Sequence, residues 1–233
     1  MAKEVILTAD KIKKRKKALL RTKIIISLLI LIFLLIFAIL SIIFNVNRFT
    51  ISLDSKLQDE KGIILYSDKE EKAHQRKLFA DTLNDMDNIT YDWIPKDVNS
   101  SSNGGSHNGD NYIAYTFYIE NEGNVSVNYW YTIKIDDVIK GVDEAFRVIV
   151  YLNDEETVYA KKNKDSGEAE KDTEMFYKDD TVVLKSRDDF KVGDIDKFTI
   201  VIYLEGEDPD CLNDIIGGEI KMHMEIREEH LDE

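Results

Sequence analysis

The chain has 233 residues, of which 43% are hydrophobic and 33% charged, and its formal net charge is −14. This length suits one domain plus an appendage, because single domains usually contain ~100–200 residues. One cysteine excludes a disulfide scaffold and Cys-rich zinc modules, and two prolines and eleven glycines exclude collagen-like and Pro-rich chains. The hydrophobic fraction is too high for a wholly disordered chain.

The charge is divided unevenly along the chain. Residues 1–23 carry nine basic and two acidic side chains, whereas residues 24–233 carry 22 basic and 43 acidic ones. A basic N-terminal tail of charge +7 therefore precedes an acidic remainder of charge −21. An acidic remainder of this size would repel phosphates, so no nucleic-acid partner is expected.

Residues 24–44 form an uncharged run, IIISLLILIFLLIFAILSIIF, in which Ser27 and Ser41 are the only polar side chains. As a helix rising ~1.5 Å per residue, this run reaches about 30 Å, the thickness of a bilayer core. A buried core helix would need a polar stripe, which the run lacks. We therefore predict a transmembrane helix at 24–44 that contacts membrane lipid, together with the basic tail at 1–23.

A basic tail followed by an apolar run is also the plan of a cleaved signal peptide. This run exceeds the usual ~7–15 apolar residues of such a peptide, and residues 45–49 offer no cleavage site of the A-x-A type. An uncleaved signal anchor is therefore favoured. Only Arg48 closely follows the run, so the positive-inside rule predicts a cytoplasmic tail at 1–23 and an extracellular domain at 45–233 in the cell membrane.

The external residues are predicted to form an all-β domain, an antiparallel β-sandwich of jelly-roll type with one or two short helices. Nine segments have the composition or the apolar alternation of strands: 49–53, 63–66, 112–120, 125–135, 146–152, 157–161, 181–185, 197–205 and 219–226. Alternation predicts one buried and one wet face for each strand, with Val201 as an exception. A parallel α/β sheet would instead have fully apolar strands separated by helices.

Two helices and two loops are predicted between these strands. Residues 67–70 resemble a capping box and precede apolar side chains at helical spacing, namely Leu78, Phe79, Leu83 and Met86. A second, short helix is predicted at residues 212–216. Residues 99–111 and 161–172 are polar and are predicted to be exposed, flexible loops.

The sequence contains no recognisable catalytic motif. The four histidines, His74, His107, His223 and His230, have no paired metal-binding spacing, and the last three are expected to be solvated on the surface. G-x-S-x-G, P-loop and G-x-G-x-x-G motifs are absent, and the carboxylates are too numerous to nominate a glycosidase pair. We therefore predict no enzymatic activity, no catalytic residues and no bound cofactor.

Acidic side chains are most concentrated in residues 205–214, EGEDPDCLND. Ca²⁺ takes oxygen ligands, so the carboxylates of this segment are calcium candidates: Glu205, Glu207, Asp208, Asp210 and Asp214. Their spacing is not that of an EF-hand. The alternative is a solvated turn in which Asp208 or Asp210 caps the short helix that follows.

Two single residues have alternative interpretations. Cys211 has no partner for an internal disulfide, so it is either buried as a small hydrophobic residue or available for intermolecular pairing. Trp130 lies between Tyr129 and Tyr131, and in a strand it would point away from both. One interpretation of Trp130 is a platform that binds sugar or peptide. The other, which is more frequent for Trp, is a side chain covered by a loop.

Three segments carry a resemblance to known proteins: YIAYTFYIENEGN at 112–124, VIYLEGEDPDC at 201–211 and GGEIKM at 217–222. They resemble uncharacterised membrane-anchored exported proteins of Gram-positive Firmicutes, which are distantly similar to the camelysin and TasA-type surface and biofilm-fibre proteins. The resemblance implies a jelly-roll β-sandwich. The fibre proteins lose a signal peptide, whereas this chain is expected to keep its anchor, and the metallopeptidase role attached to camelysin-like proteins finds no metal-ligand motif here.

The expected function is that of a single-pass cell-envelope protein that displays a non-catalytic β-sandwich for adhesion, assembly or matrix interaction. Its expected partner is a cell-surface protein or a matrix component, and the sequence indicates no particular oligomeric state. One alternative is a surface hydrolase with a carboxylate-based site. Another is an envelope signalling or secretion accessory protein whose basic tail contacts a cytosolic partner, because 23 residues can hold a docking peptide but no domain.

Overall fold

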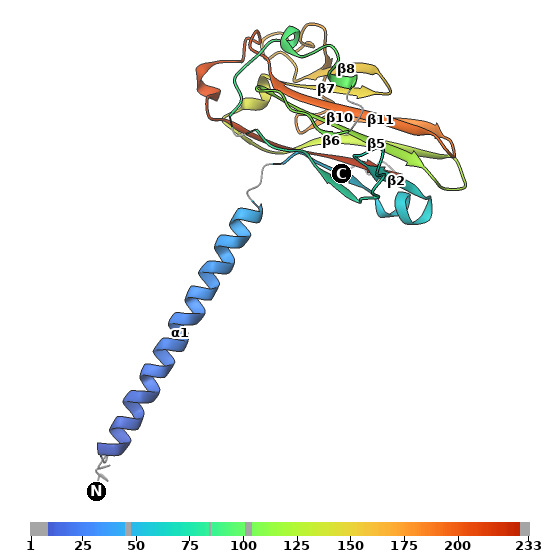
Figure 1. The fold of residues 1–233 in the computed structure, drawn as a ribbon. Coiled ribbons are helices and arrows are strands. Elements are labelled where there is room, and N and C mark those ends of the chain that lie inside the picture. Colours follow the sequence, from blue (N-terminus) through green and yellow to red (C-terminus); the bar gives the residue numbers. More distant parts are fainter. Residues whose placement is uncertain (1–8, 45–47, 84, 101–103, 229–233) are drawn as a thin grey trace. The chain divides into compact units, whose positions relative to one another are not determined.

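A computed structural model describes residues 9–44, 48–83, 85–100 and 104–228 of the chain (Figure 1). The chain divides into two compact units, Met1–Val46 and Asn47–Glu233. The first unit contains one long helix, and the second contains all the strands of the described residues. We describe each unit by itself.

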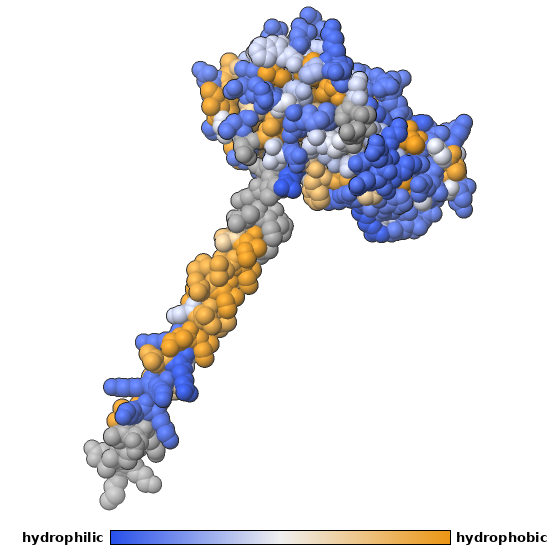
Figure 2. All heavy atoms as spheres, viewed as in Figure 1, coloured by the Kyte–Doolittle hydropathy of each residue, from blue (hydrophilic) through white to orange (hydrophobic). Residues whose placement is uncertain are grey.

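The helix of the first unit, α1, spans Ala9–Phe44. Its stretch Ile12–Ile39 is long and apolar enough to cross a membrane, and none of it is buried within the protein. Figure 2 shows a continuous apolar band along the helix beside a hydrophilic segment rich in Lys and Arg. The predicted long apolar helix is confirmed, and it begins earlier than residue 24 because Lys and Arg are themselves good helix formers.

The second unit is a β-sandwich of two mixed sheets (Figure 1). Sheet A contains, in spatial order, β10 (Thr181–Phe190), β6 (Val127–Ile139), β12 (Glu219–Arg227), β1 (Thr50–Leu53) and β3 (Lys77–Phe79). Sheet B contains β2 (Ile63–Tyr66), β5 (Tyr112–Asn121), β11 (Ile195–Leu204), β7 (Phe146–Leu152), β8 (Glu155–Ala160) and β9 (Glu174–Met175), with β4 (Gly105–Ser106) beside β5. The predicted β-sandwich is confirmed.

All nine predicted strands are present, but their pairing is not purely antiparallel. β1 runs parallel to β12, with Thr50 opposite His223, and β8 runs parallel to β9. The sequence missed only β3, β4 and β9, which have two or three residues each and are too short for alternation to be visible. Among the residues described in this unit there are also five short helices: η1 (Lys56–Glu60), η2 (Tyr91–Trp93), η3 (Val98–Ser100), η4 (Val142–Glu144) and η5 (Asn213–Ile215).

The main core lies between the two sheets and is rich in aromatic side chains. The rings of Phe117 and Phe198 stack with centroids 5.2 Å apart, and Tyr131 meets Phe198 edge-on at 5.2 Å. Such pairs add about 0.5–1.5 kcal/mol each beyond the burial of their area. Phe117 and Phe198 are neighbours within sheet B, and the contact of Tyr131 with Phe198 joins the inner face of sheet A to that of sheet B.

The central strands of sheet B, β5, β11 and β7, are buried on both faces, unlike the one-sided strands that we predicted. The connection between β3 and β5 covers its outer face, where Ile89, Ile94 and Val98 pack against Val201 and Tyr203 in a second hydrophobic cluster. Val201 broke the predicted alternation because its side of β11 is covered by this connection rather than by water. The apolar residues on the outer face thus replace the polar ones that a wet face would carry.

The predicted helix after residue 67 is wrong. Asp68 Oδ1 accepts the backbone amides of Glu70 at 2.7 Å and Glu71 at 3.1 Å, which stabilises a turn. Leu78 is 2% exposed in β3, where it pairs with Ile51 of β1. Burial of Leu78 between the sheets therefore outweighs the local helical spacing. The second predicted helix is present as η5, one short 3-10 turn.

The two predicted loops differ in their exposure. In residues 104–111, β4 pairs with β5, and both ring nitrogens of His107 lie 3.1 Å from carbonyl oxygens, those of Gly105 and Val98. His107 is therefore half-buried and not the solvated residue that we predicted. Residues 161–172 are mostly exposed, as predicted, although Lys161 is half-buried.

Candidate functional site

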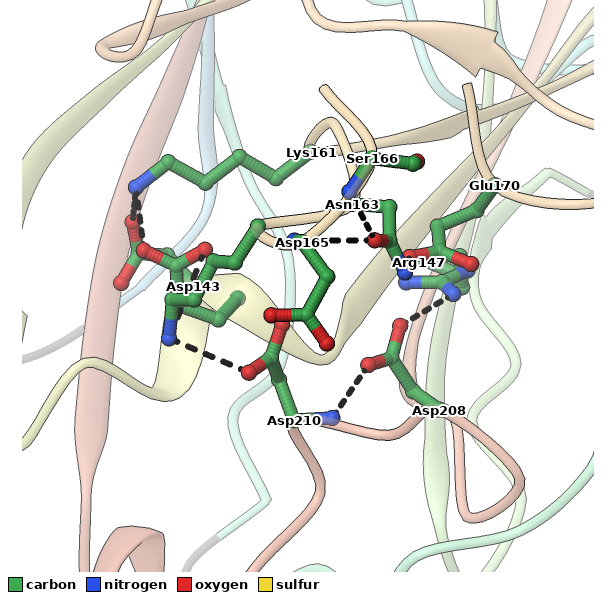
Figure 3. A network of polar contacts seen from close by, with 11 residues as sticks. Asp143, Arg147, Lys161, Asn163, Asp165, Ser166, Glu170, Asp208 and Asp210 are labelled. Carbon is green, nitrogen blue, oxygen red and sulfur yellow. Dashed lines mark hydrogen bonds and ion pairs between the residues drawn. The ribbon is translucent and has the colours of Figure 1, made fainter. Parts of the chain in front are cut away.

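The densest polar contacts lie at one end of the sandwich, where β6, β8 and β11 end and β7 and β12 begin. We call this group the end network. Its members are Asp143, Glu144, Arg147, Lys161, Asn163, Lys164, Glu170, Asp208 and Asp210. Most of these residues are labelled in Figure 3, which shows that they come from η4, β7, the β8–β9 connection and the β11–β12 connection.

The centre of the end network is a buried ion pair between Arg147 of β7 and Asp208 of the β11–β12 connection. Their side chains are 5% and 0% exposed. Asp208 Oδ1 also accepts the amide of Asp210 at 2.8 Å, and Arg147 Nη1 donates to the carbonyl of Phe146 at 3.2 Å. Because buried charges are costly unless they are paired and hydrogen-bonded, this contact fixes the β11–β12 connection to β7.

A second ion pair joins the end of β8 to η4. Lys161 Nζ lies 2.5 Å from Asp143 Oδ2 and 2.9 Å from Glu144 Oε1. Burial alone would lower the pKa of Lys161, but the hydrogen bonds to the two carboxylates outweigh burial and raise it. Lys161 is thus held as a cation between the end of β8 and η4.

The β8–β9 connection supplies the remaining members of the end network. Asn163 Oδ1 accepts the amides of Asp165 at 3.0 Å and Ser166 at 2.9 Å, and this turn is visible in Figure 3. Next to Asn163, Lys164 Nζ lies 3.3 Å from Asp210 Oδ1. The network therefore links three connections of the sandwich through charge-assisted contacts.

The structure separates the five calcium candidates. Asp208 and Asp210 join the end network and face Arg147 and Lys164, respectively. Glu205 instead accepts the amide of Glu207 at 3.1 Å. Among the described residues, no three or more His, Cys, Asp or Glu side chains are grouped so that they could hold a metal ion.

The two remaining candidates are Glu207, which is exposed, and Asp214, which lies in η5. The capping alternative is wrong, since η5 begins after Leu212 without a side-chain cap. The side chains of Asp208 and Asp210 instead form ion pairs with Arg147 and Lys164, respectively, and neither caps η5. The calcium site stays a prediction.

The other singled-out residues are engaged in ordinary contacts. Cys211 is half-buried, packs against the main core and accepts a hydrogen bond from Asn88 Nδ2 at 3.3 Å, which agrees better with a small core residue than with a pairing thiol. His223 Nδ1 lies 2.8 Å from Asp136 Oδ1, and its side chain is 23% exposed, so it is less solvated than predicted. His230 lies outside the described residues.

The most exposed tryptophan is Trp93, which our sequence reasoning missed. Trp93 is 72% exposed in η2, whereas Trp130 is half-buried on the outer face of sheet A. Ile94, the next residue, is buried in the second hydrophobic cluster, and Tyr91 donates to Glu156 at 2.6 Å. Trp93 is therefore a large apolar side chain held in water by a fixed segment, which is an unusual arrangement for Trp.

A signal for Trp93 was present in the sequence. Residues 91–95, YDWIP, place two aromatic side chains in a connection that is predicted to contain no strand. Aromatic residues in such a connection either cover a sheet or remain exposed for contact. Here Ile94 covers sheet B and Trp93 remains exposed.

The described surface also contains an open depression of about 370 Å³ between the ends of β1 and β12. Its polar lining includes Ser52, Asp54, Lys56, Glu225, Arg227 and Glu228. Arg227 is already paired with Glu225 at 2.7 Å. Ser52 Oγ donates to the carbonyl of Met224 at 3.3 Å.

Comparisons with known proteins do not show a family. No family model and no curated protein matches the chain. A solved structure described as the crystal structure of β-glucosidase from Kluyveromyces marxianus in complex with glucose has 15% identity and a TM-score of 0.28. The match covers 78% of this chain and 18% of that one, so the chain spans less than a fifth of the enzyme.

Proposed function

We propose that this protein is a single-pass cell-envelope protein that displays a non-catalytic β-sandwich for adhesion, assembly or matrix interaction. In this proposal residues 1–23 are cytoplasmic, the apolar part of α1 crosses the cell membrane, and residues 45–233 are extracellular. The partner is a cell-surface protein or a matrix component. The proposal needs no catalytic residue and no cofactor.

The observation that carries the proposal is the exposure of α1. Residues 24–44 of this helix are uncharged and long enough to span a bilayer, and within the first unit none of the stretch Ile12–Ile39 is buried. A helix that is hydrophobic all round needs an apolar environment, which a bilayer supplies. The Lys and Arg side chains on its N-terminal flank support a cytoplasmic tail, because such residues resist translocation.

The pairing of the charged side chains in the end network supports a domain that presents a binding surface rather than one that catalyses a reaction. Arg147 and Asp208 neutralise each other within the end network, and Lys161 is held between two carboxylates. A nucleophile or general base would instead have to be free to face a substrate. These groups stabilise connections of the sandwich, as expected for a domain whose role is to present a surface.

Trp93 is the residue that we assign to contact with the partner. It is the most exposed large hydrophobic side chain described, and the segment that carries it is fixed by the burial of Ile89 and Ile94. Exposed, rigid aromatic side chains lose little conformational entropy on binding, and Trp is enriched among residues that dominate binding energy. The surface around Trp93 therefore suits contact with a sugar ring or an apolar side chain.

The experiment is a pull-down with the full-length protein in detergent, using isolated cell walls, extracellular matrix and membrane extracts from the producing cells as baits. We expect saturable binding to at least one bait and a loss of at least tenfold in affinity for Trp93→Ala. Tyr177→Ala is the matched control, because Tyr177 is 53% exposed and aromatic but lies elsewhere. Binding to none of the baits, or equal losses in both variants, would contradict the proposal.

A further inference from the structure

Three exposed aliphatic side chains lie at the same end of the sandwich as the end network. Ile139, Leu212 and Ile216 are 43%, 58% and 68% exposed. We call them the apolar end. Exposed large aliphatic residues are common singly, but a group of them marks a surface that contacts an apolar partner.

Backbone pairing brings the members of the apolar end together. Ile139 is the last residue of β6 and pairs with Glu219, the first residue of β12. Lys140, which follows Ile139, donates from Nζ to the carbonyl of Ile216 at 2.5 Å. The end of β6 and the β11–β12 connection are therefore neighbours, and they present their aliphatic side chains with one lysine beside them.

The exposure of these side chains is built into the fold. Ile215 is 8% exposed and anchors η5 in the main core, between Leu212 and Ile216. The buried pair of Arg147 and Asp208 fixes the start of the same connection. With both sides of η5 attached, Leu212 and Ile216 cannot turn into the core without breaking these contacts.

The chain approaches sheet A from the side of this end. β1 runs parallel to β12, and its first residue, Thr50, lies opposite His223, four positions after Glu219, at which β12 begins. Phe79, which pairs with Thr50, adds a further apolar side chain that is 51% exposed. Five residues separate Phe44 from Thr50, and extended residues span at most ~3.5 Å each, so this stretch reaches about 20 Å.

We propose that the apolar end binds the headgroup interface of the bilayer that holds α1. The aliphatic side chains of Ile139, Leu212 and Ile216 enter the interface, while Lys140 keeps its contact with the carbonyl of Ile216. A short tether gives the domain a high effective concentration at the lipid surface, so three side chains suffice for a contact that would be weak in solution. This inference rests on the proposed membrane anchor.

The test uses the full-length protein in nanodiscs of zwitterionic phospholipid, some of which carry a spin-label quencher near the headgroup or deep in the acyl chain. An environment-sensitive fluorophore is attached to single cysteines, Ile216→Cys or Val192→Cys, in a Cys211→Ser background. Val192 is the matched control, because it is 53% exposed in the turn between β10 and β11, at the opposite end of the sandwich. Leu31→Cys in α1 reports on the anchor itself.

We expect headgroup-level quenching at Ile216 at least three times that at Val192, and deep quenching at Leu31. Adding Leu212→Ser should reduce the quenching at Ile216 while leaving that at Leu31 unchanged. Equal quenching at Ile216 and Val192 would overturn the inference. A blue shift at Ile216 that follows the protein-to-lipid ratio without lipid quenching would also overturn it, because a second copy would then cover the apolar end. Absence of quenching at Leu31 would instead contradict the membrane anchor.

Discussion

The guanidinium of Arg147, at the start of β7, donates to the carboxylate of Asp208 in the β11–β12 connection, and both side chains are shielded from water. Removing one partner would leave the other charge buried and unpaired. We expect Arg147→Met to lower the free energy of unfolding by about 3–5 kcal/mol. Chemical denaturation of the full-length protein in detergent measures this change.

The control for this prediction is the exposed pair of Arg76 and Asp59, whose side chains are 61% and 55% exposed. Water and salt screen such a pair, so Arg76→Met should cost no more than about 1 kcal/mol. Equal losses for Arg147→Met and Arg76→Met would mean that the end network does not stabilise the β11–β12 connection.

A second buried carboxylate, Asp196 at the start of β11, is held by three donors. Tyr129 donates at 2.6 Å, Asn153 at 2.6 Å and Arg187 at 3.1 Å. Tyr129→Phe removes one donor from a carboxylate that is 1% exposed, and we expect a loss of about 1–3 kcal/mol in the free energy of unfolding. Tyr177→Phe, at an exposed position, should change it by less than about 0.5 kcal/mol.

The buried tyrosines predict weaker folding in alkaline solution. Burial raises the pKa of Tyr131 to about 12, and burial together with the charge of Asp196 raises that of Tyr129 well above 10. Above pH 10 the unfolded chain loses tyrosyl protons that the folded domain keeps, so the free energy of unfolding falls as pH rises. Below pH 10 this contribution is fully present.

Denaturation over a series of pH values, with tyrosinate absorbance recorded in parallel, measures this dependence. Tyr131→Phe should make the free energy of unfolding fall less steeply as the pH rises above 10, because it removes one tyrosine whose pKa burial raises. Tyrosinate formation by every tyrosine before unfolding begins would contradict the prediction.

Calcium gives a test of the acidic segment at 205–214. Asp208 and Asp210 face Arg147 and Lys164, so we expect millimolar Ca²⁺ to leave the melting temperature unchanged relative to a chelator. A ligand that binds only the folded state at a hundred times its Kd would add about 2.7 kcal/mol of stability, which a melting curve detects. A melting temperature that is higher with Ca²⁺ than with the chelator, and that is no longer higher in Asp210→Asn, would establish the calcium site.

Much of the fold could be predicted because it is encoded in local alternation. In β6, Tyr129, Tyr131 and Ile133 are buried while Asn128 is exposed, as the period of two requires. The same reasoning failed for β11, where Val201 is buried on the outer face. That burial depends on a distant connection that covers sheet B, and no periodicity within β11 reports it.

Long-range pairing also explains what the sequence could not show at the candidate site. Arg147 and Asp208 lie 61 positions apart and meet only because β7 pairs with β11. The sequence shows the concentration of carboxylates at 205–214, but the cationic partners of Asp208 and Asp210 come from other elements. Leu78 likewise has helical spacing with its sequence neighbours, but it lies in a strand of sheet A because it pairs with Ile51.

The central claim is that α1 anchors the protein in the membrane with the sandwich outside. Protease treatment of intact cells that produce the full-length chain, with one epitope tag at each terminus, tests it most directly. We predict that the protease removes the C-terminal tag and leaves an N-terminal fragment in the membrane fraction that is protected until the cells are lysed. Protection of the C-terminal tag in intact cells, or release of the sandwich without α1 into the medium, would contradict the account.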